Sequence, residues 1–142
     1  MSTAIGKHEV EPHSKPIGRY APMRTCLIEP GSIAVTISGQ VAVDADGAVR
    51  CPGDPEGQAN IVFSQLIELL AHAGGRLTDL QSVMIILSDR AHFDQVNQVR
   101  NRIFATYAPA STLIIAELAE AGCLVEVNGF AIIDGTQIVE GR

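Results

Sequence analysis

The sequence is poor in positive charge. It has 10 lysines and arginines against 16 aspartates and glutamates, which gives a formal net charge of -6 at pH 7. Proteins that grip phosphate backbones or anionic membrane surfaces do so with clustered cations. We therefore expect no nucleic acid and no membrane among its partners.

The chain also lacks long apolar runs and a paired set of cysteines. The most apolar run, Met84–Leu87, is far shorter than the roughly 20 residues that span a bilayer. No apolar stretch follows a basic start at the N-terminus. The cysteines Cys26, Cys51 and Cys123 are odd in number and widely spaced, which is typical of a reduced protein. These features predict a cytoplasmic location.

The common sequence motifs for catalysis and cofactor binding are also absent. There is no glycine-rich phosphate loop, no paired-cysteine metal site and no nucleophile elbow. The histidines His8, His13, His72 and His92 are scattered, so they do not have the spacing of a metal site. We therefore predict no metal and no cofactor.

What the chain does have is enough apolar material for one core. Its 142 residues are the length of one domain, and 46% of them are hydrophobic, with a mean hydropathy of +0.21. We expect an N-terminal tail over residues 1–16 and a single domain over 17–142. The apolar surplus favours burial between subunits.

The patterning predicts an α+β layer fold. Asp54 and Pro55 are typical of a helix start, and apolar residues at three- and four-residue spacing extend that helix to Gly74. Two β-branched runs, over 33–37 and 40–43, are separated by Ser38-Gly39 and followed by turn residues over 44–47 before Ala48-Val49, which predicts a hairpin or short meander. The other expected elements are a strand over 82–88, a helix over about 90–107, and strands over 112–116 and 124–133.

In chain order these elements are strand, strand, helix, strand, helix, strand, strand. This order predicts a two-layer structure in which two helices cover one face of a single sheet. The other face would then be bare, and a small closed oligomer would cover it.

Two polar residues, Asn97 and Glu126, and the segment Ser38-Gly39-Gln40 are candidates for chemistry, and each also has a purely structural interpretation. Asn97 lies in the apolar stripe of the second helix, where an amide must find partners. Glu126 stands between Val125 and Val127, so alternation places it on the opposite face from them, a face that solvent could simply cover. Gly39 allows either a bend in the strand or close approach of a ligand to the backbone.

Short segments in a fixed order carry a family resemblance. They are Gly18-Arg19-Tyr20-Ala21-Pro22, Ile37-Ser38-Gly39-Gln40, the helix led by Gln58, the stretch from Phe93 through Asn97 to Phe104, Pro109-Ala110-Ser111-Thr112, Leu118 and Leu124-Val125-Glu126-Val127. From about residue 17 to 133 the chain resembles the Rid (YjgF/RidA) superfamily, the reactive-intermediate deaminases.

The resemblance implies a fold, an assembly and an activity. The fold is similar to that of trimeric chorismate mutase, with three subunits whose sheets pack into a barrel-like centre and with pockets between subunits. The best-known members hydrolyse 2-imino or enamine acids, released by pyridoxal-phosphate enzymes, to 2-oxo acids and ammonia, without cofactor or metal. A homotrimer that binds a small molecule is therefore expected.

The resemblance also implies site residues. Glu126 matches the glutamate that positions or activates the attacking water. Tyr20, Gly39 and Asn97 match positions that line or support the pocket, and Ser111 and Thr112 are expected to shape or polarise it with them as substrate-binding residues. In the best-known members an arginine that pairs with the substrate carboxylate stands where this chain has Ser111.

The missing cation leaves the function open between alternatives. Arg24 or Arg100 could supply it from another direction. Without it the pocket would favour a neutral or amine-bearing imine, enamine or related carbonyl derivative. The leading hypothesis is such an enzyme with Glu126 as its acid-base residue, and the alternative is a non-catalytic ligand-binding or regulatory trimer. The older association of the family with ribonuclease activity is disfavoured by the acidic charge balance.

Overall fold

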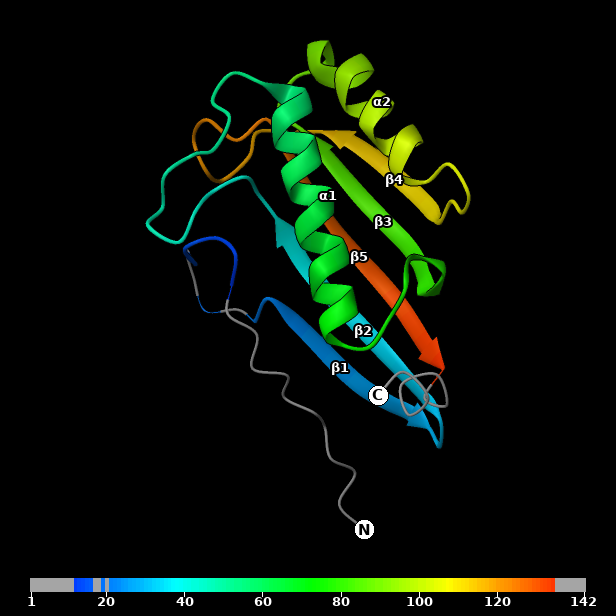
Figure 1. The fold of residues 1–142 in the computed structure, drawn as a ribbon. Coiled ribbons are helices and arrows are strands. Elements are labelled where there is room, and N and C mark those ends of the chain that lie inside the picture. Colours follow the sequence, from blue (N-terminus) through cyan, green and yellow to red (C-terminus); the bar gives the residue numbers. More distant parts are fainter. Residues whose placement is uncertain (1–11, 17–18, 20, 135–142) are drawn as a thin grey trace.

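Both helices lie on one face of a single five-stranded sheet (Figure 1). The computed structural model describes residues 12–16, 19 and 21–134. The elements are β1 (Met23–Glu29), β2 (Ser32–Gln40), α1 (Pro55–His72), β3 (Leu80–Leu87), α2 (Phe93–Ile103), β4 (Ala110–Ile115) and β5 (Val125–Asp134). The predicted α+β class, with two helices on one face, is confirmed.

The order of strands across the sheet is β1-β2-β5-β3-β4. The β3–β4 pair is parallel, and α2 makes the crossover between these two strands. The other neighbouring pairs are antiparallel. β1 and β4 therefore form opposite edges of the sheet, and α2 lies over the β4 edge (Figure 1).

The first helix forms as its sequence signals predict. The Asp54 carboxylate caps it by accepting a hydrogen bond from the Gly57 amide at 3.0 Å, and Pro55 occupies the first turn. The chain leaves the helix at Gly74, where a φ of 90° suits glycine. Its apolar stripe packs on the sheet, with the fully buried Phe63 edge-to-face against Phe104 at 5.7 Å between ring centroids.

The predicted break between two strands at Ser38–Gly39 is not observed, whereas the predicted turn at Asp44–Gly47 forms and is closed by an antiparallel bridge between Val43 and Val49. β2 runs through Ser38–Gly39 as one strand, and its pairing with β5 shifts register between Ile37 and Gln40. The strand continues because it pairs with β5 on both sides of the shift, and the Ser38 hydroxyl donates to the Ala21 carbonyl oxygen at 2.5 Å. The strand that pairs with the first part of β2 is β1, which the sequence pattern did not reveal.

The second helix is shorter than predicted at both ends. A 3-10 turn, Arg90–His92, precedes it, because the Asp89 carboxylate accepts from the Ala91 amide at 2.8 Å and caps that turn. The helix ends at Ile103. Tyr107 follows in a loop, and its hydroxyl donates to the Leu80 carbonyl oxygen at 2.5 Å, which ties the loop to the sheet.

The face of the sheet away from the helices is rich in large apolar side chains, and we call it the open face. Met84, Ile114, Phe130 and Ile132 lie on it with 37%, 41%, 37% and 38% of their surfaces exposed. No helix among the described residues is long and apolar enough to cross a membrane. An apolar face of this kind is typical of a surface that another protein chain covers.

Candidate functional site

Glu126 lies on the open face, as strand alternation predicts. Its neighbours Val125 and Val127 are fully buried on the helix side, and Glu126 is partly buried on the other side. Its partner in the β3 ladder is Ile86, whose side chain points to the same face. The carboxyl group therefore lies beside an aliphatic side chain, a setting in which its charged form is poorly solvated.

The Glu126 carboxylate packs directly on the backbone of Gly39 in β2. A Cβ atom at Gly39 would lie 2.7 Å from Glu126 Oε2, closer than such atoms approach in proteins. Glycine at this position therefore makes room for the carboxylate. Among the described residues no group donates a hydrogen bond to Glu126. Its oxygens are consequently available for a proton or for a water molecule.

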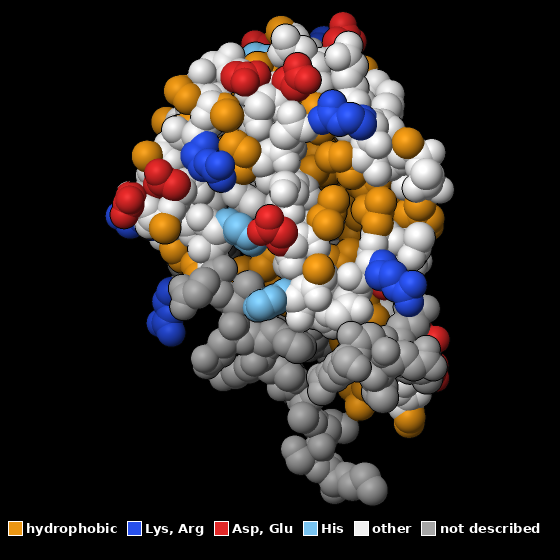
Figure 2. All heavy atoms as spheres, in the orientation of Figure 1, with side chains coloured by type: hydrophobic (Ala, Val, Ile, Leu, Met, Phe, Trp, Pro, Cys, Tyr) orange, Lys and Arg blue, Asp and Glu red, His pale blue; other side chains and the backbone are white. Residues whose placement is uncertain are grey.

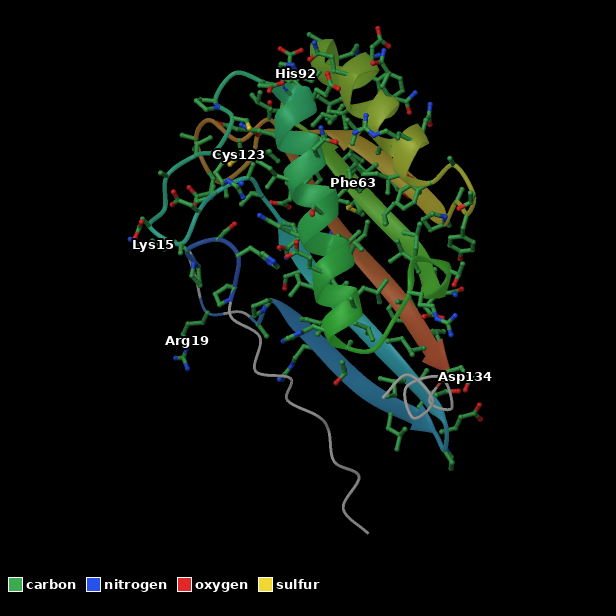
Figure 3. All side chains as sticks on the ribbon, viewed as in Figure 1. Lys15, Arg19, Phe63, His92, Cys123 and Asp134 are labelled. Carbon is green, nitrogen blue, oxygen red and sulfur yellow. The ribbon has the colours of Figure 1, made fainter. Side chains whose placement is uncertain are left out.

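Burial raises the pKa of Glu126 above its usual value of 4.5. Cys123 lies in the loop that leads into β5 (Figure 3). Burial, together with the carboxylates of Glu120 and Glu126, raises the pKa of its thiol to about 11. The thiol is thus neutral at physiological pH, while Glu126 holds a proton more readily than an exposed carboxyl group does. Of the two groups, Glu126 is the one suited to acid-base chemistry.

The raised pKa of Glu126 makes stability depend on pH with a definite sign. Between the usual carboxyl value of 4.5 and the raised value, the folded chain binds more protons than the unfolded chain. The free energy of unfolding therefore falls as pH rises through this window, and the stabilisation is complete below it. Urea denaturation of wild type and Glu126→Gln across this range should show a pH-dependent difference in unfolding free energy. Parallel curves would contradict the raised pKa.

A second cluster joins α2 to β4 on the helix side of the sheet. Arg100 Nε and Nη2 donate to Asn97 Oδ1 at 3.1 and 2.5 Å, and Arg100 Nη1 donates to Ser111 Oγ at 3.3 Å. Asn97 thus satisfies its amide oxygen within its own helix, three residues from Arg100. The arginine brings a positive charge to Ser111, the position where the resemblance expects an arginine. Arg24, the other candidate cation, lies on β1 at the opposite edge of the sheet.

The predicted site residues therefore fall into groups on the two faces of the sheet. Glu126 and Gly39 lie together, and Thr112 shares their open face because its β3 partner is the exposed Met84. Ser111 points to the helix side with Asn97, where its β3 partner Val83 is buried. Tyr20 lies outside the described residues. One copy of the chain does not bring the two groups into contact.

A cavity of about 570 Å³ lies between the start of α2 and β4, and we call it the α2–β4 groove. No sequence motif indicates this groove, although the alternation that places Leu113 and Ile115 on one side of β4 is visible in the sequence. Among the described residues no group of His, Cys, Asp or Glu is arranged to hold a metal ion. The residues that line the groove are Arg90, Ala91, Phe93, Asp94, Leu113 and Ile115.

Comparison with known proteins identifies the family. The family model described as Endoribonuclease L-PSP matches residues 13–133. YyfA of Yersinia pestis, a protein of the conserved Rid family, superposes with a TM-score of 0.72 at 23% identity, covering 89% of this chain and 95% of its own. The E. coli YjgF gene product superposes with a TM-score of 0.69 at 21% identity, covering 92% and 98%.

E. coli TdcF, solved with bound serine, superposes with a TM-score of 0.71 at 19% identity, covering 87% of this chain and 95% of its own. At these identities the superpositions establish the fold alone. The family model spans most of the chain and includes the Glu126 and Gly39 positions and the α2–β4 edge. The chain therefore belongs to the Rid (YjgF/RidA) family, whose sequence model carries the description Endoribonuclease L-PSP.

Proposed function

We propose that the protein is a Rid-type enzyme that hydrolyses a small imine, enamine or related carbonyl derivative, with Glu126 as its acid-base residue. The observation that carries this proposal is the Glu126 carboxyl group. It is partly buried, packs on the Gly39 backbone, accepts no hydrogen bond from the described residues, and has a raised pKa. A carboxyl group in this state exchanges a proton with a substrate or water more readily than an exposed one.

The chemistry needs one water molecule and one proton shuttle. The substrate reacts as the protonated imine. Glu126 takes a proton from water while the water oxygen bonds to the imine carbon, which gives a neutral carbinolamine. Glu126 gives that proton to the amine nitrogen and then takes the hydroxyl proton as the carbonyl forms and the carbon–nitrogen bond breaks. The products are the carbonyl compound and ammonia, which picks up the remaining proton as ammonium. An enamine first takes up a proton on carbon and becomes the imine. General acid-base catalysis of this kind contributes roughly 10²- to 10⁴-fold to the rate.

We propose further that the complete site forms between copies of the chain in a homotrimer. The Asn97–Ser111 cluster and the Glu126–Gly39 pair lie on opposite faces of the sheet, so they meet only if the α2–β4 edge of one copy approaches the open face of another. The exposed apolar residues of the open face supply a surface for that contact.

Nucleic acid is a less suitable substrate. On the face shown in Figure 2, the lysine and arginine side chains are separated from one another and interspersed with acidic ones. The chain carries a net charge of -6. Binding to a phosphate backbone depends on clustered cations. We therefore do not propose ribonuclease activity for this chain, although the family description contains the word endoribonuclease.

A coupled assay tests the proposal. An amino-acid oxidase generates 2-imino acids in place, and their lifetime is followed by trapping with semicarbazide. Wild-type protein is expected to shorten that lifetime. If wild type leaves the lifetime of the 2-imino acids unchanged and Ser111→Arg shortens it, the remaining site residues are competent for hydrolysis, and the natural substrate lacks a carboxylate. If neither wild type nor Ser111→Arg shortens the lifetime although a ligand binds, the protein is a non-catalytic ligand-binding trimer, and the enzymatic proposal is wrong.

A further inference from the structure

A second cavity lies on the helix side of the sheet, away from the open face and Glu126. It has a volume of about 330 Å³ and lies between the N-terminal segment, the loop before α1 and α1 itself, and we call it the α1 pocket. The proposed reaction uses none of its residues. Its polar lining includes His13, Arg50, Ser64, Gln65 and Glu68.

Backbone and side-chain hydrogen bonds fix the N-terminal segment at this pocket. The Lys15 amide donates to the Asp44 carbonyl oxygen at 3.0 Å. The Ser14 hydroxyl donates to the Val41 carbonyl oxygen at 2.9 Å. Both acceptors lie in the loop that follows β2, so His13 is held at the pocket by the residues next to it in the chain.

Two buried acceptors that belong to the pocket residues have no partner among the described residues. Gln65 has only 4% of its surface exposed, and its Oε1 atom accepts no hydrogen bond. His13 Nε2 lies 2.8 Å from Glu68 Oε2 and carries the hydrogen, because a carboxylate only accepts. In a neutral ring His13 Nδ1 is then an acceptor, and it too is buried without a partner. Because buried polar atoms are nearly always paired in folded proteins, both atoms call for a hydrogen-bond donor.

The charged groups of the pocket favour a ligand with two opposite ends. Glu68 binds His13 through Oε2, which leaves Oε1 as a third acceptor beside Gln65 Oε1 and His13 Nδ1. Three acceptors match in number the three N–H donors of a primary ammonium group. The exposed guanidinium group of Arg50 has no partner among the described residues. It repels a simple cation and attracts an anionic group.

We infer that the α1 pocket is a second binding site, which takes a small zwitterion with a primary ammonium group and an anionic group. The ammonium group donates to Gln65 Oε1 and to the Glu68 carboxylate, and the anionic group pairs with Arg50. The inference concerns binding and is independent of the proposed reaction. The two sites are separate because α1 and the open face with Glu126 lie on opposite sides of the sheet (Figure 1).

An NMR titration of the full chain with three probes of similar size tests the inference. 3-Aminopropanoate has both charged groups, propylamine has the ammonium group alone, and propanoate has the carboxylate alone. 3-Aminopropanoate should shift the side-chain amide signals of Gln65 and bind about tenfold or more tightly than the other two. Aminoacetate and 4-aminobutanoate, titrated in the same way, provide shorter and longer spacings between the charges.

Glu68→Gln should weaken binding of 3-aminopropanoate by about tenfold or more, as expected for loss of a charged hydrogen-bonding partner. Glu56→Gln is the matched control, because Glu56 is exposed in the first turn of the same helix and lies outside the pocket lining. Failure of all three zwitterions to bind would overturn the inference. Equal affinity for 3-aminopropanoate, propylamine and propanoate, or equal weakening in the two glutamine variants, would overturn it as well.

Gln65→Leu separates a binding role from a structural role. Leucine removes the buried acceptor and keeps an apolar stem in its place. The variant should lose binding, while urea denaturation should give a free energy of unfolding no lower than that of wild type, because an unpaired buried acceptor is removed. Wild-type affinity in Gln65→Leu, or a clear loss of stability, would show that the Gln65 amide serves the fold rather than a ligand.

Discussion

Replacing Glu126 with glutamine is expected to lower the rate constant of imine hydrolysis by about 10²- to 10⁴-fold. Glutamine keeps the size of the side chain and its packing on Gly39, but it neither accepts a proton from water nor returns one. The loss should therefore appear in kcat rather than in substrate binding. The coupled assay with wild type and Glu126→Gln, together with a titration of 4-methyl-2-oxopentanoate, measures the two quantities separately.

Glu120→Gln is the matched control for this experiment. Glu120 also raises the pKa of Cys123, so its replacement removes a negative charge from the same region. Its turnover should stay within about twofold of wild type, because Glu120 is not among the proposed site residues and a charge that remains partly exposed contributes little. Similar losses in both glutamine variants would show that overall charge rather than the Glu126 carboxyl group controls the reaction. An unchanged rate in Glu126→Gln would exclude this residue as the acid-base group.

The second large effect is expected from a charge on the open face. Phe130 lies on β5 with 37% of its surface exposed and with apolar residues on the same face. If copies of the chain bury this face, Phe130→Glu places an unpaired carboxylate in an apolar interface and should weaken association by more than about 100-fold. Light scattering at micromolar concentration should then show a trimer for wild type and a monomer for the variant.

The same variant should lose imine hydrolysis, because the proposed site needs residues from two copies. Ala71→Glu provides the control, since Ala71 is exposed on α1, on the side of the sheet away from the open face. It should remain trimeric and active. A folded, monomeric Phe130→Glu variant with wild-type turnover would show that one copy suffices for catalysis. A trimeric variant would show that the open face is not the interface.

The parts of the fold that the sequence predicted are those with strong local signals. α1 combines a capping aspartate, a proline in the first turn and an uninterrupted apolar stripe, and its bounds agree with the prediction. β1 has no such signal. Its Arg24 and Cys26 are exposed and it lies at an edge, so its formation depends on pairing with β2, which a local pattern does not encode.

The same distinction between local signals and tertiary contacts applies to the candidate site. Strand alternation was sufficient to place Glu126 on the face opposite Val125 and Val127. The contact of Arg100 with Ser111 was left open, because it depends on how α2 packs over the β4 edge. The spacing of 11 residues between them says nothing about that packing when a loop intervenes. Contacts between elements are tertiary information, and here they change the expected charge of the site.

A site shared between copies is tested most directly by mixing two impaired variants. Glu126→Gln lacks the acid-base group but keeps Arg100, and Arg100→Gln lacks the cation but keeps Glu126. Each alone should be nearly inactive at substrate concentrations below KM. After unfolding and refolding together in equal amounts, random trimers should regain about a quarter of wild-type activity, because about one interface in four combines both intact residues. A mixture no more active than its separate components would contradict the shared site.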